Sequence, residues 1–137
     1  MGRLSEFIGL YIVERDIDDR KAGVQLRFEG RAVLSMSPSG AIYSETGVLN
    51  MGGKRFESER NYLWHEEGAR ICVRFADGRD FHIFDPVVGG PVTAHLCGAD
   101  IYCGCYDLSG WPRWSVTWEV SGPRKNYLSV TTYVLAN

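Results

Sequence analysis

A long run of alternating apolar and polar side chains is the feature that most constrains the fold of this chain. Between residues 24 and 36, apolar or small residues occupy the even positions, whereas the odd positions carry mostly polar ones, such as Arg27 and Glu29. A period of two is typical of a β-strand with one face buried. Most strands have about 5–6 residues, so this length favours a barrel wall over a small sandwich.

Turn-forming clusters separate about ten candidate strands along the rest of the chain. Asp77-Gly78, between residues 71–75 and 80–84, is the strongest hairpin signal. A second alternating segment, residues 114–120, places two tryptophans and two valines on one face. The sequence therefore predicts an all-β fold, an antiparallel up-and-down meander barrel of about eight to ten strands, with residues 1–137 forming one domain.

Residues 54–64 are compatible with either a strand or a helix. Phe56, Arg60 and Trp64 would share a helical face, and the segment contains good helix formers. Glycines flank the segment at Gly52-Gly53 and Gly68, and strands are expected on both sides. These neighbours favour a strand.

Composition excludes several classes of partner. The net charge of −2 gives no basic field for nucleic acid, and no stretch reaches the ~18 apolar residues of a membrane helix. The apolar run at residues 7–13 is short and follows Glu6, which is unlike a secretory signal. The chain is expected to be cytoplasmic, with its four cysteines as reduced thiols.

Arg60 is the first candidate binding residue. On a strand it shares a face with Tyr62 and Trp64, and these rings indicate that the face looks inward. A buried guanidinium needs an acid or a bound anion. One interpretation is a structural ion pair with Glu45, which shares a face with Tyr43 on the preceding strand. The other is an anchor for a carboxylate or polar ligand.

The histidines offer a weaker hypothesis. His82 and His95, with Cys97, are the candidate ligands if a metal binds, although the ligand spacing of a zinc knuckle is lacking. A hydrogen-bonded wall histidine is the commoner role, so no metal and no other cofactor are expected. Phosphate-loop, zinc-protease and nucleophile-elbow motifs are lacking.

Several segments carry a resemblance to known families. The strands in meander order resemble the calycin superfamily of lipocalin-like and fatty-acid-binding-like barrels, and Gly9-Leu10-Tyr11 stands where lipocalins carry Gly-x-Trp. The chain more closely resembles a bacterial family of small lipocalin-like proteins, a domain of unknown function. The matching segments are residues 15–17, 43–45, 60–64, 75–79 with 81–82, 95–97, 100–102, 111–114 and 122–127. The resemblance implies a barrel and no particular activity.

The leading functional hypothesis is an intracellular barrel that binds a small ligand with a polar or anionic group. Its expected partner is that small molecule, with no nucleic acid and no membrane. The candidate ligand-binding residues are Tyr43, Glu45, Arg60, Tyr62, Trp64, His82, His95, Tyr102 and Trp114. One alternative is an enzyme in the same cavity, with Glu45 or His82 as general base and Arg60 stabilising negative charge. Another is a protein-interaction module whose barrel is filled by its own side chains.

Overall fold

The computed structural model describes residues 3–94 and 98–136, and nearly all of its regular structure is β-strand. The one helix of this part of the chain is a short 3-10 turn, η1, so no described helix has the length and hydropathy needed to cross a membrane. The elements are η1 (Leu4–Phe7), β1 (Gly9–Asp19), β2 (Val24–Ser37), β3 (Gly40–Met51), β4 (Lys54–Glu67), β5 (Arg70–Phe75), β6 (Asp80–Phe84), β7 (Gly90–Pro91), β8 (Thr93–Ala94), β9 (Ile101–Asp107), β10 (Trp114–Ser121) and β11 (Tyr127–Leu135).

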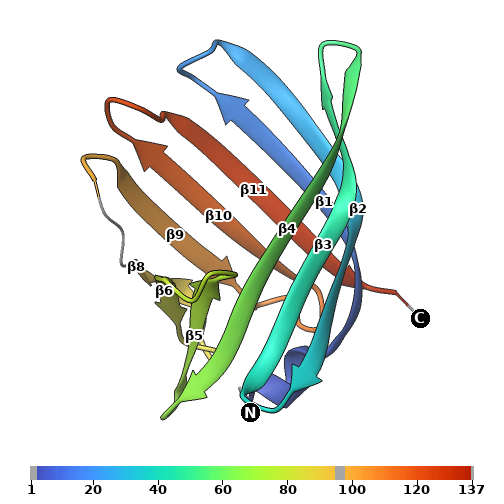
Figure 1. Cartoon of the computed structure of the whole chain (residues 1–137), viewed down its shortest axis with the longest axis vertical. Helices are drawn as coiled ribbons and strands as arrows, with labels where there is room; N and C mark the ends of the chain where they lie inside the picture. The colour runs from blue at the N-terminus through green and yellow to red at the C-terminus, as the bar shows by residue number, and fades with distance from the viewer. Residues whose placement is uncertain (1–2, 95–97, 137) are drawn as a thin grey trace.

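The strands form one antiparallel sheet in meander order (Figure 1). Each strand from β1 to β5 pairs with the next one along the chain, β9 pairs with β10, β10 pairs with β11, and β11 pairs with β1. The predicted up-and-down barrel is confirmed. The alternation at residues 24–36 becomes β2, and the ambiguous segment at 54–64 becomes β4 rather than a helix.

A short piece of chain links the two edges of the sheet. Strand β7 pairs with β9, and β8, only one residue further on, pairs with β6. Val92, between them, donates its backbone N–H to the Gly104 oxygen at 2.9 Å. Because the same segment bonds to both edges, the sheet becomes a nearly closed barrel.

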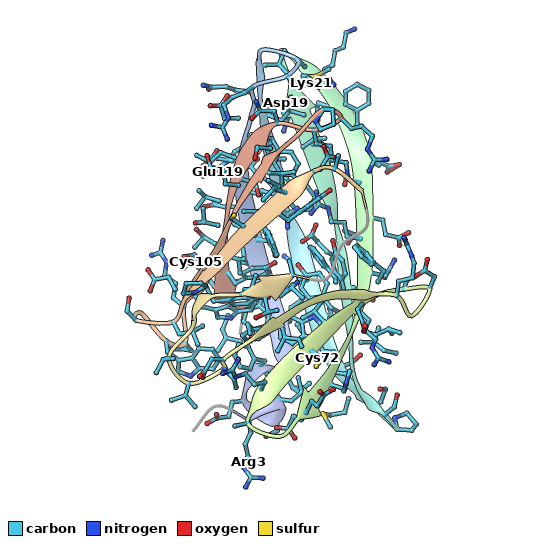
Figure 2. All side chains as sticks on the ribbon, turned by 90° about the vertical axis from the view of Figure 1, so that its left-hand side faces the viewer. Arg3, Asp19, Lys21, Cys72, Cys105 and Glu119 are labelled. Atoms are coloured by element: carbon cyan, nitrogen blue, oxygen red, sulfur yellow. The ribbon has the colours of Figure 1, made fainter. Side chains whose placement is uncertain are left out.

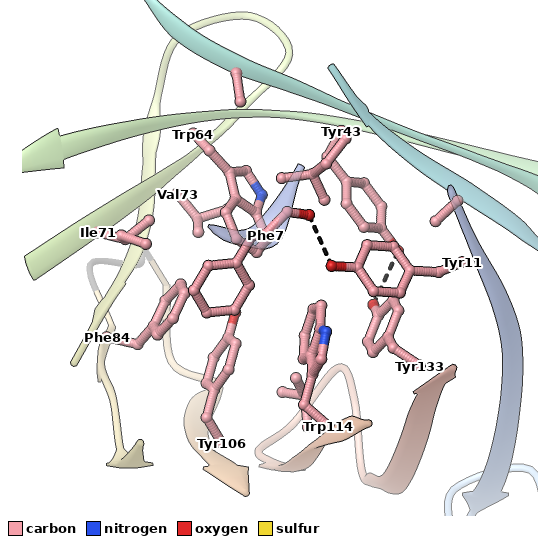
Figure 3. Close-up of a cluster of buried hydrophobic side chains, with 14 of the residues drawn as sticks. Phe7, Tyr11, Tyr43, Trp64, Ile71, Val73, Phe84, Tyr106, Trp114 and Tyr133 are labelled. Carbon is pink, nitrogen blue, oxygen red and sulfur yellow. Dashed lines mark hydrogen bonds between the residues drawn. The ribbon is translucent and has the colours of Figure 1, made fainter. Parts of the chain in front are cut away.

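An aromatic core fills one end of the barrel (Figure 3). Helix η1 places Phe7, 1% exposed, within 6 Å ring-to-ring of Trp64, Phe84 and Trp114. The Tyr11 hydroxyl donates to the Phe7 backbone oxygen at 2.7 Å, which fixes the helix against β1. This end is therefore packed with the chain's own side chains, and any cavity must lie toward the other end.

Two glycines opposite each other make room for a ring on the inner wall. Gly30 and Gly47 are paired across β2 and β3, and a Cβ built on either would lie within 2.7 Å of the Phe28 ring tip. Such a Cβ on Gly30 would also stand 2.2 Å from the Thr46 carbonyl oxygen. The small residues noted in the alternating segment thus accommodate the Phe28 side chain.

Replacing Gly30 by alanine is expected to destabilise the barrel. The added Cβ must push away backbone as well as a ring, and overpacking of this kind costs about 1–3 kcal/mol. Urea unfolding measures the loss, with Gly110→Ala as a control whose Cβ would meet no atom closer than 3.4 Å. A loss for Gly30→Ala no larger than that of the control would contradict the close approach.

Candidate functional site

An internal cavity of about 380 Å³ lies between the aromatic core and the end of the barrel opposite η1. Its lining reaches Asp19, at the far end of β1, which Figure 2 places at the opposite end of the molecule from Arg3. The lining residues come from most of the long strands: Arg15, Ile17, Asp19, Leu26, Tyr43, Arg60, Tyr62, Trp64, Val73, Phe75, Phe81, His82, Tyr102, Tyr106, Val116, Trp118, Lys125, Tyr127, Ser129, Thr131 and Tyr133.

A buried ion pair forms part of the wall between β1 and β3. Arg15 donates from Nη1 and Nη2 to the two carboxylate oxygens of Glu45, at 2.9 and 2.7 Å, and from Nε to the Thr131 hydroxyl at 2.7 Å. Arg15 is 4% exposed and Glu45 is 0% exposed. The partner of Glu45 is therefore Arg15, and the interpretation of a Glu45–Arg60 pair is wrong.

The pair stays charged although it is buried. Burial by itself would raise the pKa of Glu45, but the hydrogen bonds and charge of Arg15 outweigh it and lower that pKa. Burial would likewise lower the pKa of Arg15, and Glu45 reverses the effect and raises it. The Arg15 guanidinium also lies 5.0 Å above the Phe28 ring, so the Gly30–Gly47 gap positions the ring that supports it.

Two tyrosines continue the polar network from Glu45. The Tyr43 hydroxyl lies 2.5 Å from Glu45 Oε1. It also lies 2.8 Å from the Tyr133 hydroxyl, a contact that Figure 3 marks with a dashed line. An ionised carboxylate only accepts, so Tyr43 donates to Glu45 and Tyr133 donates to Tyr43. Burial raises the pKa of Tyr133 to about 12, which keeps its phenol protonated at neutral pH. The chain of donors thus runs from Tyr133 toward Glu45.

His82 faces the cavity from β6 as a neutral imidazole. Its Nε2 lies 2.8 Å from the Tyr106 hydroxyl, while its buried Nδ1 has no hydrogen-bond partner in the described residues. Burial lowers the pKa of His82 to about 3. At neutral pH the ring therefore carries no charge and takes part in the cavity wall as a neutral group.

A stack of rings forms part of the cavity wall. Phe81 lies between Phe75 and Trp118, at ring distances of 4.7 and 5.0 Å with nearly parallel planes. The alternation of β6 predicts that Phe81 and His82 point to opposite faces, yet both line the cavity. A register shift between Val73 and Arg74 on the adjoining strand accompanies this departure.

Two cations lie at the open end. Arg60 is exposed and has no hydrogen bond or salt bridge within residues 3–94 and 98–136. Lys125 donates from Nζ to the Tyr102 hydroxyl at 2.8 Å. Arg15 is neutralised by Glu45, and Asp19 at the rim accepts backbone N–H groups from its own turn. The cavity wall therefore carries more positive than negative charge.

The structure brings most of the predicted residues together. Those that line the cavity are Tyr43, Arg60, Tyr62, Trp64, His82 and Tyr102. Glu45 lies behind Tyr43 and Arg15, and Trp114 belongs to the aromatic core, so neither is part of the lining. His95 and Cys97 lie outside the described residues. Among the residues that the structure describes, His82 belongs to no group of potential metal ligands.

Arg15 and Phe81 are the main lining residues that the sequence analysis missed. A signal for Arg15 was available, since it follows Tyr11 and Val13 at a spacing of two and so shares their inward face. Phe81 had no such signal, because the irregular pairing beside β6 changes the face it occupies. Trp118 was assigned to the correct face, and its ring covers Gly104 on β9.

Fold and cavity together define a small antiparallel meander barrel with an internal cavity. The chain belongs to the family of unknown function DUF6314, whose family model matches residues 7–135. This finding confirms the predicted membership of a domain of unknown function. Comparison with curated proteins gives no match.

One solved structure shares the fold: a protein of unknown function of the DUF3598 family from Nostoc punctiforme. It has a TM-score of 0.56 and 7% sequence identity, and the match covers 96% of this chain and 47% of that one. At this identity the likeness shows the fold alone. The chain spans about half the length of that protein.

Replacing one member of the buried ion pair is expected to cost far more stability than replacing Arg60. Arg15→Met leaves the Glu45 carboxylate buried without a cation, which costs about 3–5 kcal/mol of unfolding free energy. The double variant Arg15→Met/Glu45→Gln should recover much of the loss, and Arg60→Met should change stability little. Urea unfolding of the three variants tests this, and equal losses for Arg15→Met and Arg60→Met would contradict the pairing.

The buried His82 is expected to make stability fall below neutral pH. Above its ordinary pKa of 6.5, both the folded and unfolded states hold the ring neutral. Below pH 6.5 the ring takes up a proton in the unfolded chain, whereas in the folded protein it stays neutral until about pH 3. The free energy of unfolding therefore declines as pH falls. The loss between pH 7 and pH 5 should be about 2 kcal/mol and should be missing in His82→Gln. A titration of the His82 ring near its ordinary pKa by NMR would contradict this.

Proposed function

We propose that the barrel binds a small molecule with a flat aromatic or conjugated body and an anionic group. The observation that carries this proposal is a cavity whose wall is rich in aromatic rings and which also bears two exposed cations, Arg60 and Lys125. The aromatic side chains that line the cavity form a broad apolar wall, and an aromatic ligand gains dispersion and burial against such a wall. A volume of about 380 Å³ suits a compound of modest size.

The anionic group is assigned to the exposed cations rather than to Arg15 in the buried wall. Arg15 already holds a carboxylate with two hydrogen bonds, so little of its charge remains for a ligand. Arg60 has no hydrogen bond or salt bridge in the described part of the chain, and its planar guanidinium fits a carboxylate or phosphate in a bidentate manner. The apolar body then extends inward toward Phe81 and His82.

Ligand binding is favoured over the two alternatives. A general base needs a pKa near the working pH, whereas that of Glu45 is lowered and that of His82 is about 3. A filled barrel would leave no cavity of this size. We also assign the protein to the cell interior, in keeping with the free thiols of Cys72, Cys103 and Cys105.

A screen of small aromatic carboxylates and phosphates tests the proposal. Thermal shift finds the binders, and quenching of tryptophan fluorescence reports contact with Trp64 or Trp118, which line the cavity. Arg60→Met should weaken binding of the best anion about tenfold or more while leaving the fold intact. Lys125→Met should weaken it as well.

The matched control is Arg31→Met, on the outer wall of β2 and outside the cavity lining. It removes the same charge from the protein without touching the site, so affinity should stay unchanged. The uncharged amide of the best ligand should bind more weakly to the wild type and equally to wild type and Arg60→Met. Equal loss of affinity in Arg31→Met and Arg60→Met would mean that only the net charge of the protein matters for binding. That result would contradict the proposal.

A further inference from the structure

Three side chains of metal-binding type meet on the outer wall of the barrel, away from the cavity lining. His65 and Glu67 lie two residues apart on β4, so they share a face. Cys72 on β5 is the direct cross-strand partner of His65. Figure 2 places Cys72 on the lower half of the barrel, well away from Asp19 at the cavity's open end. The sheet itself therefore brings the three together.

The donor atoms already stand at the spacing of ligands around one ion. His65 Nε2 lies 3.6 Å from Glu67 Oε2, and Cys72 Sγ lies 3.5 Å from the same oxygen. All three donor atoms fall within 4.8 Å of one another. Zinc bonds of about 2.0–2.3 Å in tetrahedral geometry separate neighbouring ligand atoms by about 3.3–3.8 Å. The separations of the Glu67 oxygen from the other two donor atoms fall within this range.

The donor types select the metal. A thiolate, an imidazole and a carboxylate together suit a borderline-soft divalent ion, whereas calcium and magnesium prefer oxygen alone. We propose that His65, Glu67 and Cys72 form a zinc site on the β4–β5 hairpin, with a fourth position open to solvent. On binding, the Cys72 thiol gives its proton to solvent and the thiolate sulfur takes the metal in its place.

The surroundings support a built site rather than a chance meeting of exposed groups. Cys72 is 6% exposed and the side chain of His65 is 25% exposed, so only Glu67, at 68%, is largely in water. The hairpin is tight, with only Gly68 and Ala69 between the strands, and Gly68 takes the positive φ of +61° that the turn requires. All three ligands thus lie on paired backbone, and the exposed side chain of Glu67 has room to turn toward the ion.

The experiment uses the whole chain with zinc and with cobalt(II) as a spectroscopic substitute. Calorimetry should show one equivalent of zinc bound, and cobalt should give a thiolate-to-metal charge-transfer band. Cys72→Ser should abolish the band, and His65→Gln should weaken zinc binding at least about tenfold. His65 is partly exposed, so this second variant is expected to fold even where a change at Cys72 perturbs packing.

The matched control is Cys105→Ser, which removes an exposed thiol from the outer face of β9. Zinc affinity and the cobalt band should both survive in this variant. A charge-transfer band that persists in Cys72→Ser, or zinc binding that is unchanged in His65→Gln, overturns the proposed site. So does the lack of any cobalt band in the wild type. None of these outcomes bears on ligand binding in the cavity, which Arg60→Met tests separately.

Discussion

The ion pair between Arg15 and Glu45 is the interaction on which the interior of this barrel depends. It joins β1 to β3 across the intervening β2, and Thr131 ties the same guanidinium to β11. The hydroxyls of Tyr43 and Tyr133 then take their orientation from the carboxylate. Because a charge without a partner is so costly in this setting, the network fixes side-chain positions more than it adds net stability. These hydrogen bonds hold the polar groups against the cavity wall.

Much of the architecture could be predicted because period-two patterns and turn chemistry are local properties of the chain. The alternation at residues 24–36 and the Asp77-Gly78 turn specify strands and a hairpin without knowledge of distant contacts. The closure by β7 and β8 could not be predicted in this way. Two-residue strands carry no periodicity, and their partners on β6 and β9 are determined by the shape of the finished barrel.

The sequence predicts site residues only where it predicts which face of a strand each side chain occupies. Tyr43, Tyr62 and Trp64 follow from alternation, and they line the cavity. The identity of the partner of Glu45 does not follow, because Arg60 is opposite it in register while Arg15 reaches it from two strands away. Sequence patterns report the face a residue occupies, but which of two arginines pairs with the acid depends on side-chain reach and on the ring of Phe28 beneath it.

The way the barrel closes has a consequence for its motions. Elsewhere neighbouring strands share ladders of many residues, whereas the seam consists of two pairs with β9 and two with β6. The free energy of local opening depends on the number of hydrogen bonds that must break together. The closing segment, β7 and β8, should therefore open at a lower free energy than the rest of the sheet. The wall can part there while the nine longer strands remain one curved sheet. Amide protons of Val92 and its neighbours should then exchange with solvent long before those of β2. Such opening would give the interior a second route to solvent, through the side of the barrel.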